Sequence, residues 1–283
     1  MSFKFKLSKI LSTIGIKEEI KDLFFFSANW WNRIFNLLFN SVVINQNKDY
    51  TQIPVVIISY NQYTFLKELI DYLLQINHKK IIVIDNNSTY KPLVRYLDNL
   101  NNEKISVYKL DKNYGHLVFW KKDSIFKKYS KGYYIVTDPD IMPIKECPFD
   151  FINHLKKELD SNYRINKVGI SLKIDDLPYS NLNREKIIEW EKQFWLKSNK
   201  KGNYLGNIDT TFAIYRPKSR NLDNFFYKAI RMKFPYQAQH KSWYIDSKNL
   251  SSEMNYLYEN PNSSSSWKLD QEGNILRGIY EQK

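Results

Sequence analysis

The sequence predicts an α/β fold in which helices flank a mostly parallel sheet. Two observations predict it: short runs of aliphatic residues alternate with longer segments of helical spacing, and a polar cluster follows each run. Continuous apolar runs are typical of strands that are buried on both faces, as in parallel sheets. Strands that alternate with helices indicate right-handed βαβ units. The runs lie at residues 55–58, 81–84 and 133–137, and residues 105–110 alternate between apolar and polar side chains as a further strand.

The segments between these runs have the spacing of amphipathic helices. From residue 63 to residue 76, apolar side chains recur every three or four positions, which places them on one helical face. We expect further helices over residues 91–100 and 117–129 on the same grounds. The first half of the chain therefore predicts strands and helices in regular alternation.

The second half has a weaker pattern and predicts a more mixed arrangement. We expect helices over residues 149–159 and 184–196, and strands over residues 168–174 and 208–215. After Pro217 the residues show no regular period, and we expect an irregular region there. No linker or repeat interrupts residues 51–283, so we expect a single domain that follows an N-terminal segment of residues 1–50.

The N-terminal segment contains an aromatic-rich stretch at residues 23–44 that Asn and Arg residues interrupt. A membrane-spanning helix needs about 20 mostly apolar residues, so the stretch predicts an amphipathic helix instead. Such a helix can lie on an anionic membrane surface or pack on the main domain, and the pattern leaves both open.

The chain is basic, with 43 Lys and Arg residues against 30 Asp and Glu residues and a net charge of +13. This charge favours polyanionic partners such as nucleic acids, anionic lipids or phosphorylated substrates. The lysines are spread along the chain, and zinc-finger spacing and aromatic RNA-binding signatures are absent from the sequence, so we expect no nucleic-acid partner. The single cysteine, Cys147, fits a structural role and a cytoplasmic location, with the inner face of the cell membrane as the other possibility.

The polar clusters follow the predicted strands at residues 59–61, 85–89, 113–115 and 138–140. Ligands of such sheets bind beyond the carboxyl ends of the strands, so these clusters predict one crevice. In the last cluster, Asp138 and Asp140 point to the same side of an extended chain, and Pro139 favours that conformation. Two converging carboxylates suit a divalent cation, although a solvated turn is the alternative.

These residues together resemble a known family. The set consists of residues 57–61, residues 82–89, Asn113-x-Gly115 and Asp138-x-Asp140. In order and spacing it resembles the Rossmann-like glycosyltransferase A (GT-A) fold, and more narrowly the family 2 bacterial glycosyltransferases, from Pro54 to Pro143. A later stretch resembles a bacterial subgroup that acts on surface polysaccharides, and it includes Trp190-Glu191, residues 209–213 and His240-x-x-Trp243-Tyr244.

The resemblance implies a nucleotide-sugar site and a divalent cation. Asp85 can accept a hydrogen bond from a base N–H, and Gly115 lets the backbone approach the nucleotide. Asp140 would ligate Mn²⁺ or Mg²⁺, Asp138 would contact the cation or the ribose, and His240 would complete the shell unless it is a structural histidine. The implied nucleotide-sugar-binding residues are Ser59, Tyr60, Asn61, Asp85, Asn87, Asn113, Gly115 and Asp138.

The resemblance leaves the general base and the acceptor site less defined. An inverting transfer needs a base for the acceptor hydroxyl, and Asp209 is the candidate because it begins a strand expected to face the crevice. A retaining mechanism would not use this base. The rival bases are Asp175, Asp176 and Glu253. For the acceptor we expect Trp190, Glu191 and Trp243, because sugar faces stack on aromatic rings, with core packing as the alternative for the tryptophans.

The expected activity is a metal-dependent transfer of a hexosyl or N-acetylhexosaminyl group from a nucleotide-diphosphate sugar, with a UDP-sugar favoured. The acceptor would be a hydroxyl of a cell-surface glycan: lipopolysaccharide, capsule or a lipid-linked oligosaccharide. Residues 51–145 would bind the nucleotide and residues 146–283 the acceptor. The alternatives are a sugar-nucleotide pyrophosphorylase, which the absence of glycine from residues 59–63 disfavours, and a non-enzymatic nucleic-acid-binding protein.

Overall fold

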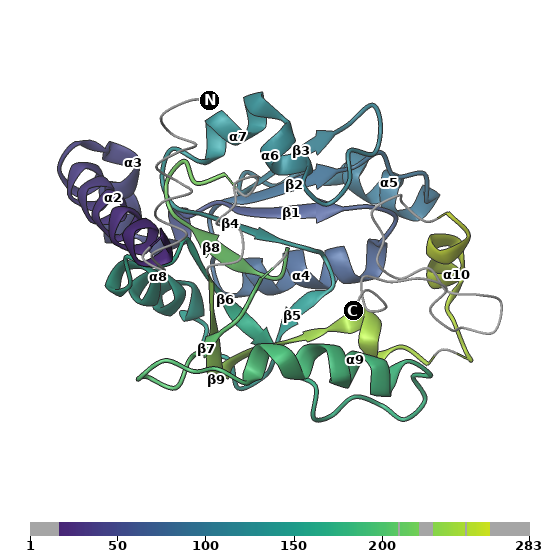
Figure 1. Cartoon of the computed structure of the whole chain (residues 1–283). Coiled ribbons are helices and arrows are strands. Elements are labelled where there is room, and N and C mark those ends of the chain that lie inside the picture. Colours follow the sequence, from purple (N-terminus) through teal and green to yellow (C-terminus); the bar gives the residue numbers. More distant parts are fainter. Residues whose placement is uncertain (1–16, 209, 221–228, 247, 261–283) are drawn as a thin grey trace, which may run out of the picture.

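The computed structural model describes residues 17–208, 210–220, 229–246 and 248–260, and a single sheet forms its centre (Figure 1). The strand order is β3-β2-β1-β4-β8-β6-β9-β5, and β7 pairs with β9. The strands are β1 (Val55–Ser59), β2 (Ile81–Asp85), β3 (Ile105–Lys109), β4 (Tyr134–Thr137), β5 (Ile141–Pro143), β6 (Lys167–Leu172), β7 (Tyr204–Leu205), β8 (Ala213–Tyr215) and β9 (Ala229–His240).

Helices cover the sheet and its ends. The α-helices are α2 (Lys17–Phe39), α3 (Ser41–Lys48), α4 (Tyr63–Gln75), α5 (Lys91–Asn99), α6 (Val118–Lys121), α7 (Asp123–Tyr129), α8 (Phe151–Ser161), α9 (Arg184–Lys192) and α10 (Ser252–Glu259). The described residues also contain three 3-10 helices, namely η1 (Tyr50–Gln52), η2 (Gln193–Trp195) and η3 (Lys241–Tyr244). The predicted helix over residues 117–129 is divided at Lys122 into α6 and α7.

The first half of the sheet is parallel, as the sequence predicts. Strand β1 pairs in parallel with β2 and β4, and β2 pairs in parallel with β3. All five residues of β1 and all five of β2 are buried, because helices cover both faces of the sheet. The α/β fold class and the Rossmann-like arrangement are therefore confirmed.

The second half of the sheet is mixed. Strand β8 runs antiparallel to β4 and β6, whereas β9 runs parallel to β6 and antiparallel to β5 and β7. The prediction of a strand over residues 208–215 was too long, since β8 contains only Ala213–Tyr215.

The prediction of an irregular region after Pro217 was wrong, because β9 and α10 lie there. Strand β9 leaves its ladder with β6 between Met232 and Gln237, where the pairing shifts and Pro235 interrupts the strand. A bulge tolerates a proline that a regular strand would exclude. The proline and the charged residues of β9 hide its period in the sequence.

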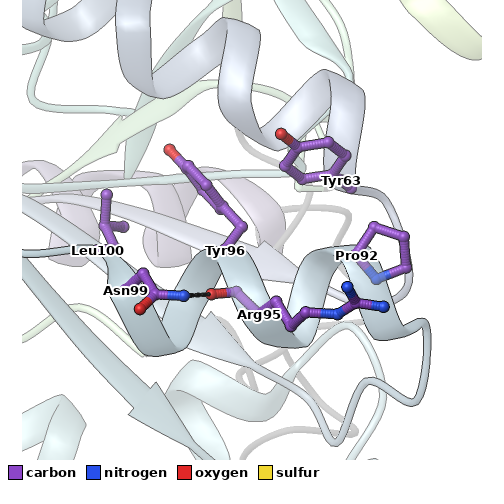
Figure 2. Close-up of a pocket in the computed structure, with 6 residues that line it drawn as sticks. All are labelled: Tyr63, Pro92, Arg95, Tyr96, Asn99 and Leu100. Carbon is purple, nitrogen blue, oxygen red and sulfur yellow. Dashed lines mark hydrogen bonds between the residues drawn. The ribbon is translucent and has the colours of Figure 1, made fainter.

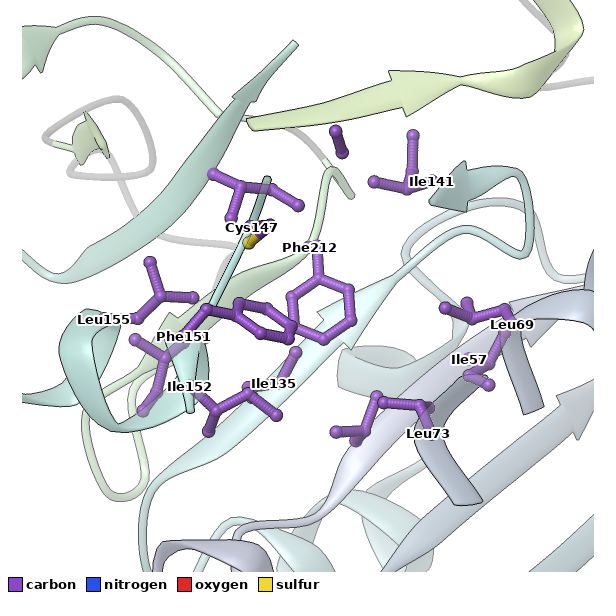
Figure 3. Packing of buried hydrophobic residues seen from close by; sticks show 14 of the residues in the cluster. Ile57, Leu69, Leu73, Ile135, Ile141, Cys147, Phe151, Ile152, Leu155 and Phe212 are labelled. Carbon is purple, nitrogen blue, oxygen red and sulfur yellow. The ribbon is translucent and has the colours of Figure 1, made fainter. Parts of the chain in front are cut away.

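The side chains of the strands alternate between two apolar layers. Val55 and Ile57 point into the layer that α4, α5 and α8 cover, whereas Val56 and Ile58 point into the layer of α6 and α7. Figure 3 shows the first layer, where the rings of Phe151 and Phe212 lie 5.1 Å apart between centroids. The layer also contains the residues Leu69, Leu73, Ile135, Ile141, Cys147, Ile152 and Leu155.

Cys147 is buried in this layer, and burial raises the pKa of its thiol to about 12. The thiol therefore stays protonated at neutral pH, which fits the structural role expected from the sequence.

Helices α2 and α3 pack beside the amino ends of the strands (Figure 1). Gln46 of α3 donates a hydrogen bond to the Tyr133 carbonyl at 2.9 Å and accepts one from the Tyr133 N–H at 2.8 Å. Gly132 permits this contact, because a Cβ there would lie 2.3 Å from Gln46 Oε1. Among the described helices, none is both long enough and apolar enough to cross a bilayer.

Candidate active site

The predicted nucleotide-binding residues lie together at one edge of the sheet. Strands β1, β2 and β4 are parallel neighbours and end at Ser59, Asp85 and Thr137, and Ser59 is paired directly with Asp85. We call this edge, with the loops that follow these three residues, the strand-end edge. Parallel strands place their carboxyl ends, and therefore their bound ligands, at the same edge.

Asn61 connects the loop after β1 to the loop after β2. Its backbone has a positive φ of 54°, and its buried side-chain Oδ1 accepts hydrogen bonds from the N–H groups of Thr89 at 2.8 Å and Tyr90 at 3.0 Å. Its own N–H donates to Ser88 Oγ at 2.9 Å. Asn61 is thus a structural link in the strand-end edge, whatever contact its amide nitrogen makes with a ligand.

Asn86 holds the loop of residues 113–115, and the sequence analysis did not single it out. Its Nδ2 donates to Asn113 Oδ1 at 2.8 Å and to the Gly115 carbonyl at 3.1 Å, while its Oδ1 accepts from the Tyr114 N–H at 2.8 Å. Gly115 has a φ of +78°, which a residue with a Cβ rarely adopts. The only signal for Asn86 in the sequence is its place between Asp85 and Asn87.

Several polar groups at the strand-end edge are buried without a hydrogen-bond partner in the described part of the chain. They are Ser59 Oγ, Asn61 Nδ2 and Asn113 Nδ2. Buried polar groups are ordinarily satisfied, because an unpaired one costs about 1–3 kcal/mol. Asp85, by contrast, has Oδ1 engaged by the Ser88 N–H at 3.0 Å.

The two carboxylates of the Asp-Pro-Asp motif have different neighbours. Thr210 donates a side-chain hydrogen bond to Asp138 Oδ2, and the Asp138 N–H donates to the Thr210 carbonyl at 2.9 Å. Asp140 is 4% exposed, accepts a hydrogen bond from Ser242 Oγ, and has Oδ2 at 3.5 Å from His240 Nδ1. Asp138 therefore faces the loop before β8, and Asp140 faces the end of β9.

The structure brings the His240 imidazole close to the Asp140 carboxylate, and Trp243 packs against the imidazole. The His240 ring is stacked on Trp243 with a centroid distance of 4.6 Å and an interplanar angle of 18°. Its Nδ1 is buried and makes no hydrogen bond to any described residue. Within the described ranges, however, no three His, Cys, Asp or Glu side chains lie close enough together to hold a metal ion.

The residues expected at the acceptor are largely buried. Glu191 is 3% exposed and forms an ion pair with Arg231 Nη1 at 2.8 Å. Burial raises the pKa of Glu191, although Arg231 and His240 act in the opposite direction. Trp243 is 4% exposed, and Trp190 is half-buried with its ring edge-on to Phe194.

The candidate bases have different surroundings, and Asp209 lies outside the described residues. Asp175 and Asp176 both pair with Lys173, at 2.9 Å and 3.0 Å. Although burial alone would raise the pKa of Asp176, hydrogen bonds from Tyr244 and Lys173 lower it.

Glu253 serves as a cap for a distant helix. Its carboxylate accepts hydrogen bonds from the Thr64 N–H at 3.0 Å and from Thr64 Oγ1 at 2.6 Å, in the first turn of α4. The N-terminus of a helix favours a negative charge, so the contact stabilises both α4 and the attachment of α10.

Helix α10 lies beside the strand-end edge (Figure 1). Tyr256 donates to Thr89 Oγ1 at 3.0 Å, and its ring lies 5.2 Å from that of Tyr90. Burial and the Tyr256 hydroxyl raise the pKa of Tyr60, and burial and Asp140 raise the pKa of Tyr258 to about 12. The contacts of Tyr256 therefore attach helix α10 to the loop that follows β2.

A separate depression of about 390 Å³ opens between α4 and α5 (Figure 2). Its lining residues are Tyr63, Pro92, Arg95, Tyr96, Asn99 and Leu100. None of these residues is a predicted site residue, and none belongs to the loops of the strand-end edge.

The sequence model of glycosyl transferase family 2 matches residues 55–222, more than half of the chain. The chain belongs to this family. The matched residues of this family 2 glycosyltransferase include the whole parallel half of the sheet and the Asp-Pro-Asp motif, so the resemblance carried by those motifs is confirmed.

Solved structures resemble this family 2 glycosyltransferase only distantly. A fragment of S. aureus TarS, residues 1–349, has a TM-score of 0.39 and 14% identity over 66% of this chain and 60% of its own. The same fragment in complex with UDP-GlcNAc has a TM-score of 0.35 and 17% identity over 58% of this chain and 45% of its own. HddC from Yersinia pseudotuberculosis complexed with GMP-PN has a TM-score of 0.42 and 14% identity over 65% of this chain and 85% of its own. Likeness at this level identifies no substrate, and no curated protein matches the chain.

Two parts of the site in this family 2 glycosyltransferase escaped the sequence analysis. Asn86 lacked a distinguishing signal, and α10 lies in the region expected to be irregular. A signal for α10 was present: Ser251 precedes the helix and accepts a hydrogen bond from the Met254 N–H at 3.2 Å, as a helix N-cap does.

Proposed function

We propose that this family 2 glycosyltransferase moves a hexosyl or N-acetylhexosaminyl group from a nucleotide-diphosphate sugar to a hydroxyl of a cell-surface glycan or its lipid-linked precursor. The observation that carries the proposal is the strand-end edge itself. It gathers Ser59, Asp85 and the Asp-Pro-Asp motif inside the residues that the family model matches. The proposed location is the cytoplasm or the inner face of the cell membrane.

The nucleoside is proposed to bind between the ends of β1 and β2. Asp85 is buried and its Oδ1 is held by Ser88, which orients the second carboxylate oxygen as an acceptor for a base N–H. Ser59 Oγ and Asn113 Nδ2 are polar atoms that a ligand would satisfy. Tyr60 is half-buried, and its ring is proposed to stack on the base. The proposed donor is a UDP-sugar.

A divalent cation fits the Asp140 end of the same edge. Asp140 offers a carboxylate, and His240 offers a buried nitrogen 3.5 Å away that makes no hydrogen bond to any described residue. With so few protein donors, the fit requires further oxygens from the donor diphosphate, which Mn²⁺ or Mg²⁺ accepts. When bound, the cation would neutralise charge on the departing nucleoside diphosphate. Asp138, held by Thr210, is proposed to contact the ribose or the cation.

Asp209 remains the proposed general base of an inverting transfer, which would take the proton of the acceptor hydroxyl. Glu253 is less suited to this role, because Thr64 engages its carboxylate at the start of α4. Trp190, Glu191 and Trp243 are proposed near the acceptor. For Glu191 and Trp243, whose side chains are almost wholly buried, the proposed contribution is to support the wall of the site.

The experiment that tests this proposal is a thermal-shift screen of nucleotide-sugars with and without Mn²⁺. A specific donor at 100 times its Kd stabilises the native state by about 2.7 kcal/mol. We expect a UDP-sugar to raise Tm more strongly with Mn²⁺ than without it, and Asp85→Ala to remove the shift. Absence of a shift with every nucleotide-sugar would overturn the proposal. Release of a nucleoside triphosphate from the donor with added pyrophosphate would favour the pyrophosphorylase alternative.

A further inference from the structure

Helix α2 turns its polar side toward the protein. Asn29 Nδ2 donates to the Tyr163 carbonyl at 2.8 Å, and Arg33 Nη1 donates to the Asp160 carbonyl at 3.1 Å and to the Tyr163 hydroxyl at 2.7 Å. Asn40, directly after the helix, donates to the Lys131 carbonyl at 2.7 Å. The spacing of these residues places them on one side of the helix. A helix on the surface of a globular protein normally has the reverse orientation, with its polar side in water.

The opposite side of α2 is apolar and exposed. Trp31 is 64% exposed, Phe35 is 61% exposed and Leu38 is 63% exposed, at positions i, i+4 and i+7 of the helix. Phe39 is 71% exposed, and its ring lies 5.2 Å from that of Phe35. We call Trp31, Phe35, Leu38 and Phe39 the α2 apolar face. A contiguous exposed patch of this kind marks an interaction surface, whereas scattered apolar residues do not.

The composition around this face favours a lipid surface. Arg33 is the only charged residue from Leu23 to Asn47, and it is turned inward, so insertion of the face would desolvate no charge. Residues 1–22 contain five lysines and three acidic residues, and the whole chain has a net charge of +13. Tryptophan is enriched at membrane interfaces, and basic residues add attraction to anionic headgroups.

We propose that the α2 apolar face seats the protein on an anionic lipid bilayer. The helix would lie in the plane of the interface with its aromatic side among the headgroups, while Asn29, Arg33 and Asn40 hold its other side to the body of the protein. In Figure 1, α2 lies at the opposite end of the sheet from α10, so this contact leaves the strand-end edge uncovered. The proposal concerns lipid binding alone and does not depend on the proposed transferase activity.

Flotation with vesicles of equal parts phosphatidylcholine and phosphatidylglycerol tests the proposal. We expect the full chain to float with these vesicles, less with pure phosphatidylcholine, and less at high salt. The triple variant Trp31→Ser/Phe35→Ser/Phe39→Ser should bind about tenfold or more weakly. The matched control Phe149→Ser/Tyr179→Ser removes residues that are 63% and 88% exposed elsewhere on the surface and should bind as the wild type does.

Two measurements keep this result interpretable. Circular dichroism and the nucleotide-sugar thermal shift should be unchanged in the triple variant, since the face touches no residue of the strand-end edge. The variant Trp31→Phe, which keeps the apolar surface, should still bind the anionic vesicles. Equal flotation of the triple variant and the wild type would overturn the proposal. A wild-type dimer without lipid that the triple variant dissociates would identify the face as a contact between copies of the chain, and would overturn it as well.

Discussion

In the parallel half of the sheet, hydrogen bonds at the strand-end edge join residues that are 27 to 29 positions apart in the chain, as between Asn86 and Asn113, Thr89 and Asn61, or Tyr90 and Asn61. The partners that come from the second half are much farther away. Ser242 reaches Asp140 over 102 residues, and Glu253 reaches Thr64 over 189 residues. One side of the site is therefore assembled from consecutive βαβ units, and the other from segments that meet only in the complete fold.

The difference predicts where substitutions act. Loop contacts within the parallel half should affect nucleotide binding and local stability together, because the residues that hold the loops lie among those proposed to bind the nucleotide. Long-range charged pairs in the second half should have large effects on stability or on catalysis, depending on whether the charge is structural or faces a ligand.

The largest effect on stability is expected at the buried pair of Arg231 and Glu191. Arg231→Met leaves the Glu191 carboxylate buried and unpaired, which should lower the free energy of unfolding by about 3–5 kcal/mol in a urea titration. The control Lys233→Met changes an exposed residue of the same strand and should have little effect. The double variant Arg231→Met/Glu191→Leu should recover much of the loss, and a single variant as stable as the wild type would show that the pair is dispensable.

Asp140→Ala is expected to have the largest effect on turnover. If Asp140 holds the cation, the variant should lose about 10²–10³-fold in kcat, as removal of one transition-state stabiliser does. Mn²⁺ should no longer increase the thermal shift with a UDP-sugar, while the circular dichroism spectrum stays unchanged. The control Asp98→Ala removes an exposed carboxylate on α5 and should be neutral. Retained Mn²⁺ dependence in Asp140→Ala would assign the cation to other residues.

Asn86→Ala tests the contacts within the parallel half. The substitution leaves the Tyr114 N–H without its acceptor and Asn113 and Gly115 without their donor, so we expect a loss of about 1–3 kcal/mol in unfolding free energy. Nucleotide affinity, measured by calorimetry, should fall in the same variant. Asn99→Ala, in the last turn of α5, serves as the control with an exposed side chain. A stability loss with unchanged affinity would separate this loop from the nucleotide site.

The smallest effect is expected for Glu253→Gln, which keeps the shape of the cap but removes its charge from the start of α4. We expect a loss of roughly 0.5–2 kcal/mol in stability and a kcat near that of the wild type.

Asp209→Asn should behave in the opposite way, with unchanged stability and a kcat lower by about 10²-fold or more. The control Glu185→Gln changes an exposed carboxylate. A large loss of kcat in Glu253→Gln would transfer the role of the base from Asp209 to Glu253.

The parallel half could be predicted from the sequence because its signals are local. Apolar runs such as Val55–Ile58 need burial on both faces, and the polar residues after them can only lie at the carboxyl ends. This topology predicts that Ser59, Asp85 and Asp140 lie at the same edge of the sheet. Asn86 could not be chosen over Asn87, since only the positions of the backbone donors distinguish them.

The second half could not be predicted to the same depth, because its strand and its partners depend on tertiary contacts. Pro235 and Lys233 obscure β9, which is recognisable only when its pairing with β6 is known. The sequence made Glu253 a candidate base. Only the folded structure, in which its carboxylate accepts a hydrogen bond from the Thr64 N–H, identifies it as a helix cap. His240, in contrast, was expected near Asp140 and lies 3.5 Å from it.

The contact between Glu253 and Thr64 also has a consequence for biosynthesis. At about 5–20 residues per second, a ribosome needs roughly 10–40 s to add the 189 residues that separate the two partners. During this interval the parallel strands can already pair, but the start of α4 and the loop that carries Thr89 lack their contacts with α10. A nascent chain is therefore expected to expose the strand-end edge to other molecules in the cell until α10 has been synthesised and packs beside it.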